Sequence, residues 1–449
     1  MSSTSTESEV VKSDKYPVAI PYIIGNEAAE RFSYYGMQSI LAVFLVAQFF
    51  NPTGNPSFQV MAEAKASEKV HLFVSLAYFT PLIGAIMADW FFGKFRVILY
   101  VSIIYCFGHL VLSLFDTNQT YFEYGMILIA IGAGGIKSCV SANVGDQFDK
   151  TNEHLLSKIY GWFYFSINAG SAISTMLIPY LLDKHGASVA FGVPGILMAL
   201  ATLIFWLGRK KYVNVPPSGF NFDGQKLLEG LKAAGKVLLV FAFVPLFWGM
   251  WYQSQSEWIL DAKHLDLTLW SGFTLLSSQV QTANPVFLLT LLPVFTYIIY
   301  PFLSKIGIEP TPLRKIGAGL VITGLSFVII AQLKEVIMAG GHPSVWRQIF
   351  GYFVLSCGEI LVWVTCLEYA YTNSPKYMKS TMAAIGLLTV SLGNYLVALM
   401  QRSISSGGYF AKYQGADYYW FFVKFMFIQA IIFMLVSKFI KEQRYVGED

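Results

Sequence analysis

Hydrophobic stretches of about twenty residues recur along the whole chain, and each is bounded by charged or turn-forming residues. A helix of roughly twenty apolar residues crosses the hydrocarbon core of a bilayer, so this pattern predicts transmembrane helices rather than a soluble core. We therefore expect an all-α polytopic membrane protein. About twelve spans are predicted, near residues 17–50, 70–92, 95–115, 121–146, 157–183, 188–208, 236–260, 282–304, 313–334, 346–371, 377–401 and 417–440.

The composition agrees with this pattern. Hydrophobic residues make up 55% of the 449 residues and charged residues only 13%, and the mean hydropathy is +0.53. These values lie outside the range of soluble globular domains, which excludes that class. The polar segment 1–15 lacks the apolar region of a signal peptide, so we expect no cleaved leader.

The positions of Lys and Arg predict the orientation. If the N-terminus is cytoplasmic, the loops on that side carry most of the cations, including Lys94, Arg96, Arg209, Arg314 and Lys438. By the positive-inside rule we expect both termini to lie in the cytoplasm, with the protein in the plasma (inner) membrane. The net charge of +4 is then explained by topology and requires no nucleic-acid partner.

One long polar connection divides the spans into six and six. Two six-helix halves joined by a cytoplasmic linker are typical of the major facilitator architecture, in which the substrate binds near the midplane between the halves. The expected segments are an N-terminal tail (1–16), a first six-helix bundle (17–208), a linker (209–236), a second six-helix bundle (237–440) and a C-terminal tail (441–449).

Three ionisable residues, Glu27, Glu30 and Arg31, lie inside the first span. A charge at the bilayer centre costs about 3 kcal/mol, so such residues tend to face a cavity and to mark substrate or proton pathways. Glu27 and Arg31 are one helical turn apart, and Tyr35 and Gln38 share or flank the same face. This side of the helix is predicted to contact something polar.

Two further charges lie deep in other spans: Lys137 in the fourth and Glu359 in the tenth. They lie at matching depths, so we expect them to pair. Glu368 lies nine residues after Glu359, which turns it to the opposite helix face. We expect a structural or cytoplasmic-gate role for Glu368.

Other polar residues in the spans allow two interpretations. Tyr164 and Asn168 are one turn apart and could form one cavity wall, but Asn168 and Ser171 could equally hydrogen-bond neighbouring helices. His71, at the outer start of the second span, could titrate near neutral pH, although a single histidine there is more often a polar end residue. The four cysteines all fall within spans, so we expect free thiols rather than disulfides or a metal cluster.

The motif Glu27-x-x-Glu30-Arg31-Phe32-x-Tyr34-Tyr35-Gly36 resembles the first-helix signature of the proton-coupled oligopeptide transporter (POT) family, which belongs to the major facilitator superfamily. Segments 71–89, 134–148, 163–171 and 358–370 resemble the signatures of its second, fourth, fifth and tenth helices. The resemblance implies symport of protons with di- and tripeptides, driven by the proton gradient without a cofactor. It assigns proton coupling to Glu27, Glu30, Arg31, Lys137 and Glu359.

The same resemblance implies a peptide site. Arg31 and Lys137 would face the peptide carboxylate and Glu359 its amino terminus. Some expected binding residues come from the resemblance and others from departures from the family pattern, which are described next. Together, the expected substrate-binding residues are Arg31, Tyr35, Gln38, Tyr78, Lys137, Tyr164, Asn168, Asn284, Glu359 and Trp363.

The chain departs from the family pattern at paired positions. Gln38 and Tyr252 stand where many members have an arginine and an acid, so we expect an outer gate closed by hydrogen bonds and packing, with Lys137 and Glu359 as its remaining charged pair. His71, Tyr252 and Glu368 are the possible gate residues. Trp363 replaces a usual small residue, while the eleventh-helix tryptophan is Gly386 here, so the Trp363 indole is expected to fill similar pocket volume from the opposite wall.

Alternative functions remain open on the sequence alone. A relative carrying another small anion or a peptide-like metabolite would keep the proton-coupling residues, and a peptide sensor would bind without transport. An enzyme is not indicated, because the chain has no phosphate loop, metal-ligand cluster or nucleophile elbow. We expect peptide, protons and the lipid bilayer as partners, and function as a monomer.

Overall fold

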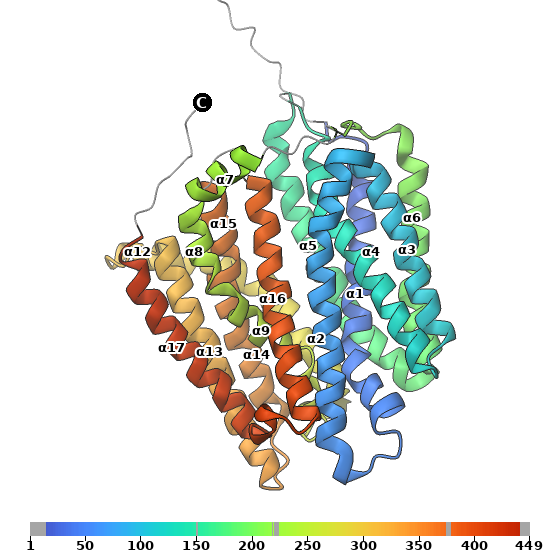
Figure 1. Ribbon diagram of the computed structural model, residues 1–449, viewed down its shortest axis with the longest axis vertical. Coiled ribbons are helices and arrows are strands. Elements are labelled where there is room, and N and C mark those ends of the chain that lie inside the picture. The colour runs from blue at the N-terminus through green and yellow to red at the C-terminus, as the bar shows by residue number, and fades with distance from the viewer. Residues whose placement is uncertain (1–14, 150, 218, 220–223, 374–378, 441–449) are drawn as a thin grey trace, which may run out of the picture.

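The computed structural model describes residues 15–149, 151–217, 219, 224–373 and 379–440. Its described residues form twelve helical segments that are long and apolar enough to cross a membrane. These segments run roughly side by side (Figure 1). The prediction of an all-α protein with about twelve spans is therefore confirmed.

Six spans form the N-terminal part of the chain. The second span begins at Pro56, earlier than the predicted residue 70, because the Asn55 side chain caps a helix whose first turns are polar. The helices are α1 (Ile20–Leu45, continued by a π-helical turn Val46–Phe50), α2 (Pro56–Met87, continued by Ala88–Phe92), α3 (Lys94–Leu114), α4 (Gln119–Gly145), α5 (Leu156–His185) and α6 (Ala187–Leu207).

The C-terminal part is less regular. Helix α7 (Gly224–Ala233) lies in the linker, and a short antiparallel hairpin, β1 (Thr268–Trp270) and β2 (Phe273–Thr274), follows the seventh span. The seventh span consists of α8 (Gly235–Phe241), α9 (Val244–Gln253) and α10 (Glu257–Ala262). The other spans are a 3₁₀ turn (Ser277–Thr282) with α11 (Ala283–Val294), a π-helical turn (Phe295–Ile299) and α12 (Tyr300–Lys305); α13 (Pro312–Met338); α14 (Val345–Glu359) with a π-helical turn (Ile360–Val364) and α15 (Thr365–Thr372); α16 (Lys379–Ser405); and α17 (Ala416–Ser437).

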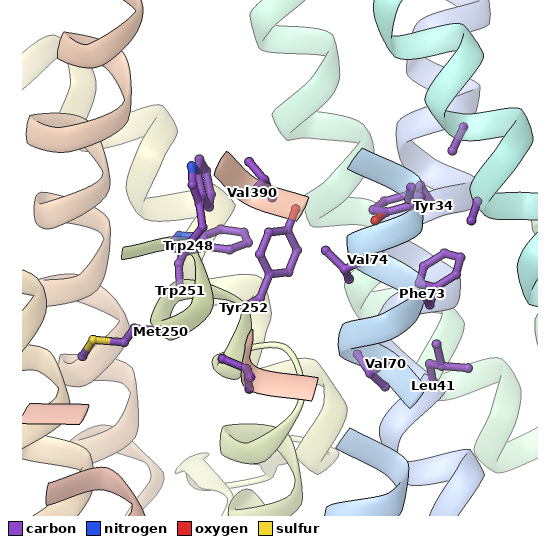
Figure 2. Packing of buried hydrophobic residues seen from close by; sticks show 14 of the residues in the cluster. Tyr34, Leu41, Val70, Phe73, Val74, Trp248, Met250, Trp251, Tyr252 and Val390 are labelled. Carbon is purple, nitrogen blue, oxygen red and sulfur yellow. The ribbon is translucent and has the colours of Figure 1, made fainter. Parts of the chain in front are cut away.

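The helices pack mainly within two groups. Helix α1 packs against α5 and α6, while α4 packs against α2 and α3; in the second group, α13 packs against α14 and α17, and α9 against α16. The groups meet chiefly where α2 contacts α16 and where α5 contacts α11. Figure 2 shows part of this packing, including the Tyr34 and Phe73 rings, whose centroids are 5.6 Å apart.

Hydrogen bonds join the two groups near one end of the molecule. Ser75 Oγ lies 3.1 Å from Ser391 Oγ, and Thr282 donates to Thr175 over 2.9 Å. Further hydrogen bonds between the groups involve His71 of α2 and the Gln279 side chain. The first residues of α1, the last residues of α17 and helix α7 share the opposite end of the molecule (Figure 1). We call these two ends the sealed end and the termini end.

Candidate functional site

A cavity of about 590 Å³ lies between the two groups of helices. Its wall on the N-terminal side comes from α1, α2, α4 and α5, and its wall on the C-terminal side from α9, α11, α14, α15 and α16. It reaches toward the termini end through Ser141, Phe163 and Leu367. A cavity of this size matches small-molecule sites, which are mostly apolar with a few placed polar groups.

Helix α1 supplies a buried cluster of charge to this cavity. Arg31 Nε donates to Glu27 Oε1 over 2.8 Å and lies 2.8 Å from Glu30 Oε2. Glu27 and Arg31 line the cavity, whereas Glu30 is fully buried behind it. One guanidinium therefore partly neutralises the charges of two carboxylates. This arrangement changes when either carboxylate takes up a proton.

Lys137 of α4 reaches the same wall without an ion pair. Its Nζ lies 3.7 Å from the ring centroid of Tyr34 and 4.4 Å from that of Tyr78, and within the described part of the chain it has no hydrogen-bond partner. Cation–π attraction stabilises the ammonium but leaves its N–H donors unused. The expected pair with Glu359 is not formed in this structure, so Lys137 is available to an anion in the cavity.

Glu359 lies on the opposite wall, at the end of α14. Its Oε2 accepts hydrogen bonds from Trp251 Nε1 over 2.7 Å and from Asn284 Nδ2 over 3.0 Å. Asn284 also donates to Ser356 Oγ. These neutral donors hold the carboxylate in place without supplying a countercharge.

Three indole rings line the same wall of the cavity as Glu359. The ring centroids of Trp248 and Trp363 are 5.0 Å apart, and those of Trp248 and Trp251 are 5.5 Å apart, both edge to face; Figure 2 shows Trp248 and Trp251 beside Tyr252. A Cβ at Gly386 would lie 3.5 Å from the Trp363 ring. Trp363 lines the cavity, so its indole occupies pocket volume beside the position of Gly386.

All the predicted binding residues except Gln38 line the cavity. Asn168 donates to the Tyr164 carbonyl of its own helix. Gln38 does not line the cavity: it is buried on α1, two turns after Arg31, and its amide atoms have no hydrogen-bond partner among the described residues. The predicted binding residues that do line the cavity are Arg31, Tyr35, Tyr78, Lys137, Tyr164, Asn168, Asn284, Glu359 and Trp363.

The three possible gate residues have different surroundings. Tyr252 lines the cavity with its ring edge toward Tyr78, at a centroid distance of 5.9 Å. Glu368 is exposed at the termini end and pairs with Lys315 of α13 over 2.9 Å. His71 is fully buried at the sealed end.

The surroundings of His71 include an acid that the sequence analysis did not single out. His71 Nδ1 lies 2.7 Å from Asn394 Oδ1, and its Nε2 lies 3.3 Å from Glu257 Oε2. Glu257 also accepts from Gln401 Nε2 over 2.5 Å and from the Tyr418 hydroxyl over 3.1 Å. The sequence did contain a signal for Glu257: it is an acid inside the predicted seventh span, and an acid inside a span is the feature that selected Glu27.

Comparisons with known proteins agree on one family. A sequence model described as "POT family" matches residues 95–228 and 221–415. Peptide transporter 3 of Caenorhabditis elegans is 36% identical over 371 residues, which cover 71% of this chain and 51% of that protein. Human solute carrier family 15 member 2 is 32% identical over 408 residues, covering 80% and 54% of the two chains. The chain thus spans about half the length of these curated relatives.

Solved structures match over nearly the whole chain. The crystal structure of an auto-inhibited POT family peptide transporter superposes with a TM-score of 0.87 at 31% identity, covering 96% of this chain and 99% of that one. The POT family transporter PepTSo gives a TM-score of 0.86 at 34% identity, covering 94% and 98%. The similarity therefore includes both groups of helices.

Proposed function

Because the chain belongs to the POT family of transporters and has the major facilitator fold, we propose that it is a proton-coupled symporter that imports di- and tripeptides by alternating access. The observation that carries the proposal is the charge of the cavity walls. Arg31 and Lys137 line one wall, and Glu359 lines the other. A zwitterionic peptide has one charge of each sign at its ends and fits this arrangement.

In the proposed complex, Arg31 and Lys137 bind the peptide carboxylate, and Glu359 binds the amino terminus. Charge-assisted hydrogen bonds are stronger than neutral ones, so the peptide ends provide most of the affinity. Tyr35, Tyr78, Tyr164, Asn168, Asn284 and Trp363 line the space between the charged groups. Recognition of the ends lets the side chains vary.

Coupling is proposed to act through Glu27, Glu30 and Arg31, with Lys137 and Glu359 contributing as binding groups. Protonation of either α1 carboxyl removes one charge that holds Arg31, which frees the guanidinium for the peptide carboxylate. Proton and peptide then favour the same conformation, and this is sufficient for coupling. The Arg31 distances of 2.8 Å to both acids support this role.

We also propose the orientation and organisation of the protein. Both termini would be cytoplasmic, in the plasma (inner) membrane, and one chain would suffice for transport. The bundles 17–208 and 237–440 would move relative to each other about the cavity, joined by the linker 209–236. The terminal residues 1–14 and 441–449 lie outside the described part of the chain.

Uptake in liposomes tests the proposal. The purified protein is reconstituted, an inward acid gradient is imposed, and uptake of radiolabelled dialanine is compared with uptake of free alanine. We expect accumulation of dialanine that a protonophore abolishes. Absence of gradient-driven uptake would overturn proton-coupled peptide symport.

Counterflow separates the alternative classes. Liposomes preloaded with unlabelled dialanine take up labelled dialanine if the protein transports the peptide, even without a proton gradient. A peptide sensor would bind without counterflow, and a carrier of another anion would show neither peptide binding nor counterflow. Arg31→Lys is a matched variant for the role of Arg31. It keeps the positive charge but loses the planar guanidinium, so it separates these two contributions to peptide binding.

A further inference from the structure

A second hollow lies on the outer surface of the N-terminal helices, away from the central cavity. It has a volume of about 580 Å³ and lies between α1, α5 and α6. Its floor consists of the small residues Gly25, Ala28, Ala29, Ala169 and Gly170, and its walls of the bulkier Phe32, Trp162, Phe165, Ile173 and Leu197. We call this hollow the α1/α5/α6 groove.

The groove results from the close approach of α1 and α5. A Cβ at Gly170 would lie 3.0 Å from the Ala28 carbonyl oxygen, so the two backbones nearly touch there. A Cβ at Gly25 would meet no atom within 4 Å, so the floor is open at that point. Trp162, Phe165 and Ile173 remain more than half exposed. In a bilayer, this surface faces hydrocarbon.

Cations lie at the end of the groove nearest the termini. Lys158 lies one helical turn before Trp162, on the same face of α5, and is exposed. Lys211 follows α6, where it is exposed and donates to the hydroxyl of Tyr22 on α1. Arg209 and Lys210 lie in the same turn. An apolar channel with cations at its membrane-surface end is complementary to an anionic lipid, which has apolar chains and a negative headgroup.

We propose that the α1/α5/α6 groove binds one anionic phospholipid from the leaflet at the termini end. One acyl chain lies along Gly25, Ala28 and Gly170, and the phosphate lies between Lys158 and Lys211. The occupant is a lipid rather than a peptide, because the groove walls offer apolar contacts at membrane depth while the charges lie only at its end. The site is separate from the central cavity: their lining residues do not overlap.

Native mass spectrometry in detergent tests the proposal, with dioleoyl phosphatidylglycerol and dioleoyl phosphatidylcholine as probes. We expect one phosphatidylglycerol to be retained in preference to phosphatidylcholine. Each cation at an anionic surface favours binding roughly fivefold, so Lys158→Gln with Lys211→Gln should reduce the preference by more than tenfold. Gly25→Leu should reduce retention of both lipids, since its side chain fills the groove.

Matched variants control for bulk and charge. Gly161→Leu adds the same side chain where a Cβ also meets open space, at a position outside the groove lining, and should leave retention unchanged. Lys305→Gln with Lys438→Gln removes two exposed cations from the C-terminal helices at the same end. Equal retention of the two lipids by the native protein, or an equal effect of target and control variants, would overturn the proposal.

A second measurement does not depend on the folding of the Gly25, Lys158 and Lys211 variants. Phosphatidylglycerol with brominated acyl chains quenches nearby indoles, so it should quench the fluorescence component that Trp162→Phe removes. Brominated phosphatidylcholine at the same concentration should quench that component less. Quenching of the Trp162 component that is equal for the two lipids would count against a site selective for the anionic headgroup.

Discussion

At the scale of single residues, the carboxylate of Glu359 is held by neutral donors from Trp251 and Asn284. Gln in its place can still accept these hydrogen bonds but has no charge. We expect Glu359→Gln to weaken dialanine binding by roughly ten- to hundredfold, since a hydrogen bond to a charged group contributes about 1.5–3 kcal/mol. Isothermal titration calorimetry in detergent measures the change.

The control for this prediction uses a different ligand and a different acid. N-acetyl-dialanine lacks the amino charge, so its affinity should be equal for the native protein and Glu359→Gln. Glu368→Gln alters an exposed acid that pairs with Lys315 outside the cavity, and it should leave dialanine binding unchanged. A similar loss for both peptides would show that Glu359 acts on packing rather than on the amino terminus.

The Nζ atom of Lys137 is buried and has no hydrogen-bond acceptor among the described residues. An unsatisfied buried donor costs about 1–3 kcal/mol, and more when charged. We therefore expect Lys137→Met to raise the melting temperature of the peptide-free protein by several degrees while abolishing uptake. Thermal unfolding in detergent is the measurement, with the exposed Lys305→Met as control. A lowered melting temperature would mean that the Tyr34 and Tyr78 rings, together with the nearby Glu27 and Glu30 carboxylates, fully compensate for burial of the charge.

The Trp363 indole occupies space between Trp248 and Gly386. Removing it with Trp363→Ser should enlarge the pocket and improve the binding of dipeptides with large side chains, relative to dialanine, by roughly tenfold. Competition across a dipeptide panel measures this selectivity. Trp346→Ser, which changes an exposed tryptophan outside the cavity lining, is the control, and identical selectivity in both variants would exclude the assigned role.

The sequence reveals some site residues more readily than others. Charges in apolar runs are costly, which is why Glu27, Arg31 and Glu359 could be selected from the sequence. Trp248 and Trp251 could not, because an aromatic residue in an apolar span has the same pattern whether it faces lipid or a cavity. Gln38, predicted as a binding residue, lies outside the cavity lining, because helical periodicity gives a face but not the depth at which the halves meet.

At the scale of elements, helices α9 and α16 approach closely at Gly393. A Cβ there would lie 2.0 Å from the Pro245 carbonyl oxygen and 2.9 Å from Gly249 N. Backbone atoms cannot move aside as a flexible side chain can. We expect Gly393→Ala to destabilise the protein by about 1–3 kcal/mol, visible as a lower melting temperature.

Gly161→Ala is the matched control, because its Cβ would meet open space. An unchanged melting temperature for Gly393→Ala would mean that α9 and α16 can separate without loss of packing energy. Equal destabilisation by both variants would mean that replacing a glycine in a membrane helix has this effect at either position. The contact between α9 and α16 would then not be the cause.

The spans were predicted more reliably than their internal breaks. Length and hydropathy suffice for a membrane span, but the seventh span is divided into α8, α9 and α10. One break lies within the polar run Gln253–Ser256, where the Ser254 and Ser256 hydroxyls donate to carbonyls of the preceding turn. Side chains that bond the backbone compete with the helix, yet the apolar residues on both sides masked this signal in the sequence.

At the scale of the whole molecule, a covalent bond can test whether the sealed end must open. The Ser75 and Ser391 hydroxyl oxygens are 3.1 Å apart, which suits a disulfide between cysteines at these positions. We expect oxidised Ser75→Cys with Ser391→Cys to lose uptake, and a reductant to restore it. Binding from the termini end should persist.

Each single cysteine variant and the native protein serve as controls, since Cys106, Cys139, Cys357 and Cys366 form no disulfide among the described residues. Oxidation should leave their uptake unchanged. Continued uptake by the oxidised double variant, with the bond confirmed by mass spectrometry, would show that transport does not need separation of α2 from α16.

The conformation itself could not be predicted from the sequence. Alternating states of one chain differ by only a few kcal/mol, and the same residues must satisfy both. Ser75 and Ser391, which join the halves here, have no distinguishing pattern in the sequence. Only the three-dimensional structure reveals which end is sealed.

Because the cavity reaches one end of the molecule and is sealed at the other, a membrane voltage is distributed unevenly across the protein. Where water enters, the field is weak, so most of a membrane voltage falls across the dry sealed layer. Moving one elementary charge through that layer changes the energy by about 2.3 kcal/mol per 100 mV. His71 and Glu257 lie in this layer, whereas Arg31 and Glu359 line the cavity. In this conformation the voltage therefore acts mainly on the His71 and Glu257 network. In the alternate conformation, with the cavity open toward the present sealed end, it would act mainly at the termini end.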